Sequence, residues 1–268
     1  MLVFAVALRL NVCVARWWEG RCLWGKLVFA AINATQQARA AIKDEKLLRR
    51  FTNAVIVFSW SCKAKLRDAR LEDLSQEGHA LVSRGLLEKA ELDEIASLDG
   101  SIWQPYHCLD VMRSVVNEGL DESVELRALL IDNSVTELAL AIGGSIRVKA
   151  TGMPHGYDLG LQALVFLYMT LGNFAFAPSC GWFTPVPMLT IFFILWALLA
   201  MGTMLIDPFG VDVVDHPLGS FCAAIEQQCN AVHERNGKAL HLPPSERAKR
   251  NKEEKEFAKT LRTCDGTS

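Results

Sequence analysis

Two long uncharged segments in the second half of the chain limit most strongly what it can fold into. Leu159 to Ala177 and Val186 to Ile206 contain no Asp, Glu, Lys, Arg or His. As α-helices of about 19 and 21 residues they rise roughly 28 and 32 Å, which matches a hydrocarbon core about 30 Å thick. They predict two membrane-spanning helices. A buried helical hairpin in a soluble core is the alternative.

The composition narrows the class of protein. Hydrophobic residues make up 51% of the 268 residues, and the net charge of −2 comes from interleaved acidic and basic side chains. No basic tract indicates a nucleic-acid partner. The eight cysteines show no CxxC spacing, so we expect reduced, packed thiols. The six histidines lie far apart without HExxH, and no GxGxxG, P-loop or GxSxG motif is present, so no enzyme is predicted.

The N-terminal segment predicts a membrane helix over residues 1–30. Met1 to Leu8 is apolar, without the basic region and cleavage site of a signal peptide, and it is too short to span alone. We therefore expect either a partial membrane helix or a natural chain that starts upstream, and favour the latter. From Asn11 to about Ala41 there is no proline, which favours one long helix.

The middle of the chain predicts helices outside the bilayer. Residues 51–62 are apolar but short, which indicates a buried or re-entrant helix. Residues 66–94 alternate charges with leucines at helical spacing, and cytoplasmic helices are expected over residues 66–142. Trp103, Pro105 and Tyr106 predict a turn, and Gly143 with Gly144 predicts a helix end.

The flanks of the spans predict their orientation. Arg147 and Lys149 precede the first span, whereas the connection from Pro178 to Pro185 is uncharged, so both outer flanks are expected on the cytoplasmic side. A further cytoplasmic helix is expected over residues 215–236. Residues 243–268 form a charged tail, either a solvated helix or disordered.

Two motifs carry a family resemblance. RWWEGRCLWGKLV runs from Arg16 to Val28 after Leu8-Arg-Leu-Asn11, and DPFGVDVVDHPL runs from Asp207 to Leu218. These resemble the RWWEGRxLWGKLV and NPFGxDxxDxPL segments of bestrophin-like anion channels, with Asp207 in place of Asn. A weaker match leads from Gly143 to Thr151-Gly-Met-Pro154, where the family usually has a second proline at Gly152.

The resemblance covers nearly the whole chain, and it implies an all-α fold over residues 1–242 in which membrane helical hairpins continue into a cytoplasmic helical bundle. It also implies a homopentamer in the lipid membrane that passes chloride, bicarbonate or a similar small anion. The plasma membrane and a plastid membrane are not distinguished. A nonconducting membrane scaffold or regulatory subunit with the same fold is the alternative function.

The resemblance also implies pore residues. A narrow apolar neck falls on Phe4 and Leu8, and a cytoplasmic aperture falls on Leu126, or on Leu129 or Leu130 if the alignment shifts by one turn. An apolar ring can gate ions by dewetting, and aromatic edges carry partial positive charge that favours an anion. Ordinary packing or lipid contact is the other interpretation of Phe4 and Leu8.

Three aspartates form a candidate calcium site. Asp207, Asp212 and Asp215 offer hard oxygen ligands around Gly210, and in calcium-activated relatives this cluster forms part of a clasp. The glutamine of that clasp corresponds to Met204 here. The alternative is that Asp207 or Asp212 caps the following helix. A membrane enzyme using these aspartates as a metal site would require metal-dependent turnover.

Overall fold

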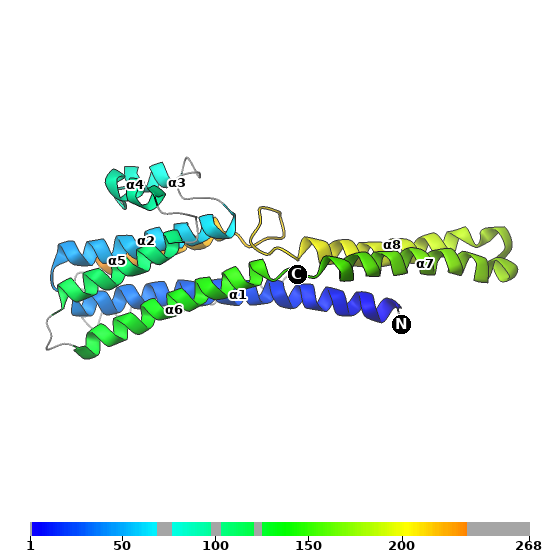
Figure 1. The fold of residues 1–268 in the computed structure, drawn as a ribbon, viewed down its shortest axis with the longest axis horizontal. Helices are drawn as coiled ribbons and strands as arrows, with labels where there is room; N and C mark the ends of the chain where they lie inside the picture. Colours follow the sequence, from blue (N-terminus) through cyan, green and yellow to red (C-terminus); the bar gives the residue numbers. More distant parts are fainter. Residues whose placement is uncertain (1, 69–76, 98–102, 121–124, 235–268) are drawn as a thin grey trace, which may run out of the picture.

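The computed structural model describes residues 2–68, 77–97, 103–120 and 125–234, and within these ranges it contains helices and no strand. The all-α fold class is thus confirmed. The chain is elongated, with a helical hairpin that projects from one end of a helical bundle (Figure 1). The elements are α1 Leu2–Ala41, α2 Glu45–Leu66, α3 Glu77–Ser83, α4 Lys89–Ser97, α5 Trp103–Gly119, α6 Glu125–Ala150, α7 His155–Cys180, the 3-10 turn η2 Gly181–Phe183, α8 Pro185–Met204 and α9 Leu218–Glu234.

Helix α1 connects the two parts of the molecule. Its N-terminal portion packs on α7 and α8, and the remainder packs on α2, α6 and α9 in the bundle (Figure 1). Its 40 residues correspond to a length of roughly 60 Å at 1.5 Å per residue. The prediction of one long helix through Asn11 and Ala41 is confirmed.

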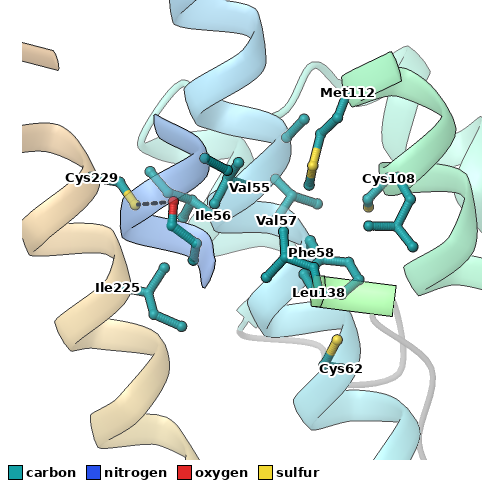
Figure 2. Packing of buried hydrophobic residues seen from close by; sticks show 14 of the residues in the cluster. Val55, Ile56, Val57, Phe58, Cys62, Cys108, Met112, Leu138, Ile225 and Cys229 are labelled. Carbon is teal, nitrogen blue, oxygen red and sulfur yellow. Dashed lines mark hydrogen bonds between the residues drawn. The ribbon is translucent and has the colours of Figure 1, made fainter. Parts of the chain in front are cut away.

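Helix α2 forms the centre of the bundle, and it contains the apolar segment 51–62. The consecutive side chains of Val55, Ile56, Val57 and Phe58 are all buried, because α5, α6 and α9 surround α2 (Figure 2). A helix that is apolar on all sides is stable only when it is enclosed in this way.

The thiols of the bundle core are packed and reduced. Cys62, Cys108 and Cys229 are buried, and the cysteines of the described ranges form no disulfide. Burial raises the pKa of Cys108 to about 12 and that of Cys229 to about 11, so both remain protonated thiols. Their role in the fold is packing.

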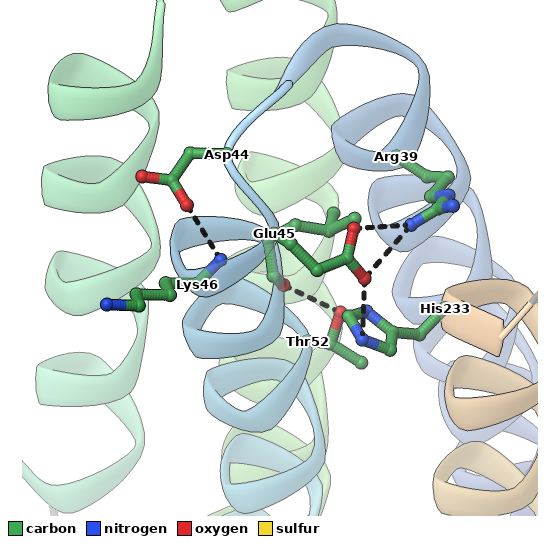
Figure 3. Close-up of polar contacts among 7 residues, drawn as sticks. Arg39, Asp44, Glu45, Lys46, Thr52 and His233 are labelled. Atoms are coloured by element: carbon green, nitrogen blue, oxygen red, sulfur yellow. Dashed lines mark hydrogen bonds and ion pairs between the residues drawn. The ribbon is translucent and has the colours of Figure 1, made fainter. Parts of the chain in front are cut away.

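Polar contacts join the ends of three helices at the far end of the bundle (Figure 3). Asp44 caps α2 by accepting a hydrogen bond from the backbone N–H of Lys46 at 2.8 Å. Glu45 accepts from Arg39 of α1 at 3.2 Å and lies 3.2 Å from Nε2 of His233 in α9. These contacts hold the C-terminal ends of α1 and α9 at the start of α2.

Two breaks expected from Gly and Pro are wrong. Gly143 and Gly144 lie inside α6. A Cβ on Gly144 would stand 2.7 Å from Leu23 of α1, so this glycine allows the two helices to approach closely. Trp103 and Pro105 open α5 and do not form a separate turn. Proline is tolerated in the first turn of a helix, where its missing N–H has no intrahelical partner.

Helices α7 and α8 form the projecting hairpin, and most of their apolar side chains are exposed. At its tip, Trp182 and Phe183 are 85% and 65% exposed. By length and composition, three segments of the described chain could cross a membrane: Leu126–Ala150, Gly156–Phe183 and Pro185–Met204. The last two are the hairpin.

The remaining segment, Leu126–Ala150, lies in α6, which was expected outside the bilayer. In Figure 1, α6 and α7 follow one another along the long axis of the molecule, and α6 packs against α1 in the bundle. Helix α1, expected to be a membrane helix over residues 1–30, is not among the three segments, and its first half carries Arg9, Arg16 and Glu19.

Candidate functional site

An uncharged strip runs along the exposed face of α1 beside the hairpin. Phe4 and Leu8 are 64% and 46% exposed, and they lie four residues apart on one face of the helix. We call the exposed positions from residue 3 to residue 18 the neck strip. Its members are Val3, Phe4, Ala7, Leu8, Asn11, Val12, Val14, Ala15 and Trp18.

The opposite face of α1 is anchored by a buried charge. Arg9 is 1% exposed, its Nε donates to Oδ1 of Asp158 in α7 at 2.6 Å, and its Nη2 lies 2.5 Å from the same oxygen. Nη1 donates to the backbone carbonyl of Leu199 in α8 at 2.8 Å. A Cβ on Gly202 would overlap Nη1, so the guanidinium fills a notch in α8.

This ion pair was not predicted, although the sequence held a signal for it. An ionisable residue in a membrane-level helix needs a partner, because an unpaired charge there is costly. Asp158 is the last charged residue before the first uncharged segment, and it lies in the first turn of α7. Pairing Arg9 with the acidic residue nearest the spans would have found it.

The two motifs contact each other. Nε1 of Trp17 donates to the carbonyl of Val214 at 2.9 Å, and Nε2 of His216 lies 2.9 Å from the carbonyl of Trp17. Phe209 is fully buried and packs over Gly20, where a Cβ would stand 3.0 Å from its ring. The segment between α8 and α9, which we call the motif loop (residues 205–217), is therefore docked on α1.

Arg16 extends this junction to the neighbouring helix ends. Its Nη2 donates to the carbonyl of Val148 at 2.7 Å and its Nη1 donates to that of Thr151, both near the end of α6. The orphan carbonyls at a helix C-terminus favour a cation. Glu19 adds an ion pair with Arg147 at 2.6 Å. Arg16 and Glu19 of the motif thus join the end of α6 to α1, and Trp17 joins the motif loop to it.

The carboxylates of two of the three aspartates, Asp207 and Asp215, stabilise the backbone of the motif loop. Asp215 Oδ2 accepts from the N–H of Asp212 at 2.7 Å, and Asp207 Oδ1 accepts from the N–H of Phe209 at 3.2 Å. Gly210 leaves room for this carboxylate, since a Cβ there would stand 2.6 Å from Asp215 Oδ2 and displace it. Burial, the largest cause, raises the pKa of Asp215.

The arrangement of these carboxylates gives calcium no support. Among the residues that the structure describes, which include all three aspartates, no group of three or more His, Cys, Asp or Glu side chains is placed to hold a metal ion. The expected helix cap is also wrong, because α9 begins at Leu218, beyond Asp207 and Asp212. Calcium binding stays a prediction from the resemblance alone.

Leu126 lies at the other end of the molecule from the neck strip. It is 70% exposed in the first turn of α6, and Leu129 and Leu130 beside it are also exposed. Arg127 donates to the carbonyl of Ala40 at 3.1 Å, which places this turn at the C-terminal end of α1. The structure therefore does not bring Leu126 together with Phe4 and Leu8.

Comparison with known proteins identifies the family. The sequence model of the family described as Bacterial/Fungal Bestrophin protein matches residues 1–231. The chain belongs to the bestrophin family. This bestrophin is 28% identical over 238 residues to a voltage-dependent anion channel-forming protein of Nostoc sp., an alignment that covers 85% of this chain and 71% of the relative. A protein of the same name from Escherichia coli K12 is 23% identical over 218 residues, covering 81% and 69%.

The fold comparison agrees. A crystal structure of a bacterial bestrophin homologue from Klebsiella pneumoniae matches this bestrophin with a TM-score of 0.76 and 27% identity, covering 87% of this chain and 84% of that one. The predicted bestrophin-like fold is confirmed, and the chain is a membrane protein. The two motifs that suggested the family are the segments that meet at the junction of α1 with the motif loop.

Proposed function

We propose that this bestrophin is one subunit of a homopentameric channel that conducts chloride, bicarbonate or a similar small anion. The observation that carries the proposal is the neck strip: an uncharged, exposed face of α1 beside the membrane hairpin, directly opposite a face anchored by Arg9. The relatives named as voltage-dependent anion channel-forming proteins support an anion as the conducted species.

The shape of the molecule supports a multi-pass arrangement in the bilayer. A hydrocarbon layer about 30 Å thick is matched by the length of α7 and α8. Because α6 and α7 lie end to end along the long axis of the molecule (Figure 1), a bilayer that contains the hairpin leaves α6 outside. The start of α1 then shares the membrane level with the hairpin, and the bundle lies on the side of Arg147 and Lys149, as the positive-inside rule requires.

Several copies of α1 around a common axis explain why its strip is exposed in one chain. A charge-free ring of Phe4 and Leu8 side chains would form a neck narrow enough to dewet, and the positive edges of the Phe4 rings would favour anions. The exposed Leu126 at the start of α6 would form a second constriction at the cytoplasmic end.

Anion flux from proteoliposomes tests the channel. We expect wild-type chloride flux, and a larger flux with weaker discrimination against a bulky anion such as gluconate in Phe4→Ala and Leu8→Ala, because a smaller side chain widens the apolar ring. Phe174→Ala is the matched control: this side chain is 75% exposed on the hairpin, and its removal should leave flux unchanged. Absence of wild-type flux would favour the nonconducting scaffold.

The assembly and the second constriction have separate tests. The mass of the purified assembly should correspond to five chains, and a lone chain would overturn the pentamer. Leu126→Ala should change chloride flux, whereas Leu140→Ala, on the same exposed face of α6 and 69% exposed, should not. Equal effects of both variants would remove the assignment of Leu126 as an aperture.

A further inference from the structure

We propose that the ion pair between the buried Arg9 and the partly buried Asp158 is a rotational lock, which fixes how α1 is turned about its own axis and so keeps Phe4 and Leu8 facing away from the hairpin. The inference rests on the proposed function, since it gives these two residues their place in the conduit. Arg9 acts here as a positioning residue and need not touch the anion.

The contacts of Arg9 reach two helices at once. Nε and Nη2 lie 2.6 and 2.5 Å from Oδ1 of Asp158 in α7, while Nη1 donates to the carbonyl of Leu199 in α8 at 2.8 Å. The planar guanidinium has a fixed fork of donors, so two partners on different helices define its direction. A turn of α1 about its axis would break both contacts together.

The ends of the hairpin are suited to this pair of charges. Asp158 lies in the first turn of α7, where the positive end of the helix dipole favours an anion. Leu199 lies five residues before the end of α8, near the negative end that favours a cation. Gly202 leaves the space that the guanidinium occupies. The site is therefore built for a cation from α1, next to an anion on α7.

Helical geometry converts this anchor into an orientation. Each residue turns an α-helix by about 100°. Arg9 shares its face with Val6 and Cys13, which are 1% and 0% exposed, whereas Leu8, about 100° further round the helix, is 46% exposed. Apolar contacts such as that of Val6 with the hairpin are non-directional and tolerate a turn of the helix. The ion pair does not, because a buried charge without its partner is strongly unfavourable.

The test measures the orientation of α1 in the intact assembly. Asn11→Cys, at an exposed polar position of the neck strip outside the apolar ring of Phe4 and Leu8, is compared with Val6→Cys, which is buried against the hairpin. Each is made in a background of Cys22→Ser, Cys180→Ser and Cys264→Ser, and the rates of N-ethylmaleimide labelling are measured. Because thiol reactivity follows exposure, Asn11→Cys should label about tenfold faster than Val6→Cys. Adding Arg9→Met should reduce this ratio by about tenfold.

Control variants separate the lock from general destabilisation. Arg84→Met removes an ion pair of comparable length at the surface of the bundle, that of Arg84 with Glu226 at 2.7 Å, and should leave the ratio unchanged. If Arg9→Met does not assemble, the double variant Arg9→Met/Asp158→Asn removes both charges, so that neither is left unpaired. It should assemble and still show the reduced ratio. Arg9→Lys keeps the charge but not the fork, and should give an intermediate ratio.

The outcomes for the lock and for the channel are distinguishable. An unchanged labelling ratio in assembled Arg9→Met or in the double variant overturns the lock, whatever the flux. No chloride flux from wild-type protein overturns the channel, whatever the labelling. A reduced ratio together with a changed chloride-to-gluconate flux ratio supports the lock in its proposed role, since loss of stability alone would lower both fluxes equally.

Discussion

The contact of Phe209 with Gly20 gives the sharpest prediction about stability, because it joins the two family motifs. Phe209 is fully buried, and a Cβ on Gly20 would stand 3.0 Å from its ring. Phe209→Ala should lower the free energy of unfolding by about 3 to 5 kcal/mol, the range for a buried phenylalanine that leaves a cavity. Gly20→Ala should lower it by about 1 to 3 kcal/mol through overpacking.

The double variant tests the geometry more directly than either single change. In Gly20→Ala/Phe209→Ala the new methyl group enters space that the ring has left, so the two effects should not add. We expect the double variant to be more stable than the sum of the single effects predicts by about 1 to 2 kcal/mol, as for residues in direct contact.

Thermal unfolding in detergent, followed by tryptophan fluorescence, measures these differences. One kcal/mol corresponds to roughly 2 to 4 °C for a chain of this size, so Phe209→Ala should lower the Tm by about 6 to 20 °C. Phe58→Ala is the matched control, because Phe58 is equally buried and is not among the atoms nearest Gly20. Its combination with Gly20→Ala should be additive. Additivity for Phe209 would refute the described contact.

Two further predictions use the same assay. Gly143→Ala should raise stability by about 0.5 to 1 kcal/mol, because no atom lies within contact distance of its Cβ position and alanine favours a helix, whereas Gly144→Ala should lower stability by about 1 to 3 kcal/mol by pushing Leu23 away. A destabilising Gly143→Ala would contradict this. Burial lowers the pKa of His216 below its ordinary 6.5, so the unfolded chain binds more protons below that value and stability falls with falling pH. His216→Gln should reduce the loss of Tm on moving from about pH 7.5 to about pH 5.5, which lie on either side of the ordinary histidine pKa. An undiminished loss of Tm would argue against a lowered pKa of His216.

The apolar helical hairpin of α7 and α8 could be predicted from the sequence because a lipid environment imposes a simple rule. In lipid every backbone polar group must be satisfied within the chain, so a long uncharged segment such as Leu159 to Ala177 is a helix. The family was also within reach, because the segment from Arg16 to Val28 is rich in uncommon residues in a fixed order. Neither inference needs knowledge of contacts between distant residues.

The sequence alone could not show the role of a residue that depends on which other residue it contacts in the fold. Gly144 looks like a helix end until Leu23 of α1 is seen against it. Asp207 and Asp215 look like metal ligands, whereas in the structure their oxygens accept hydrogen bonds from the backbone of the motif loop. The role of Arg9 becomes clear only from its ion pair with Asp158, which lies far along the chain.

The uncharged tip of the hairpin affects how the protein can insert into a membrane. The connection from Pro178 to Pro185 contains no Asp, Glu, Lys, Arg or His, and its exposed residues include Trp182 and Phe183. In the proposed topology the hairpin has no charged side chain to translocate, so α7 and α8 are able to enter the bilayer together, with both their other ends left on the side of synthesis. On arrival, the two aromatic rings suit the far headgroup layer and would keep the hairpin from slipping back.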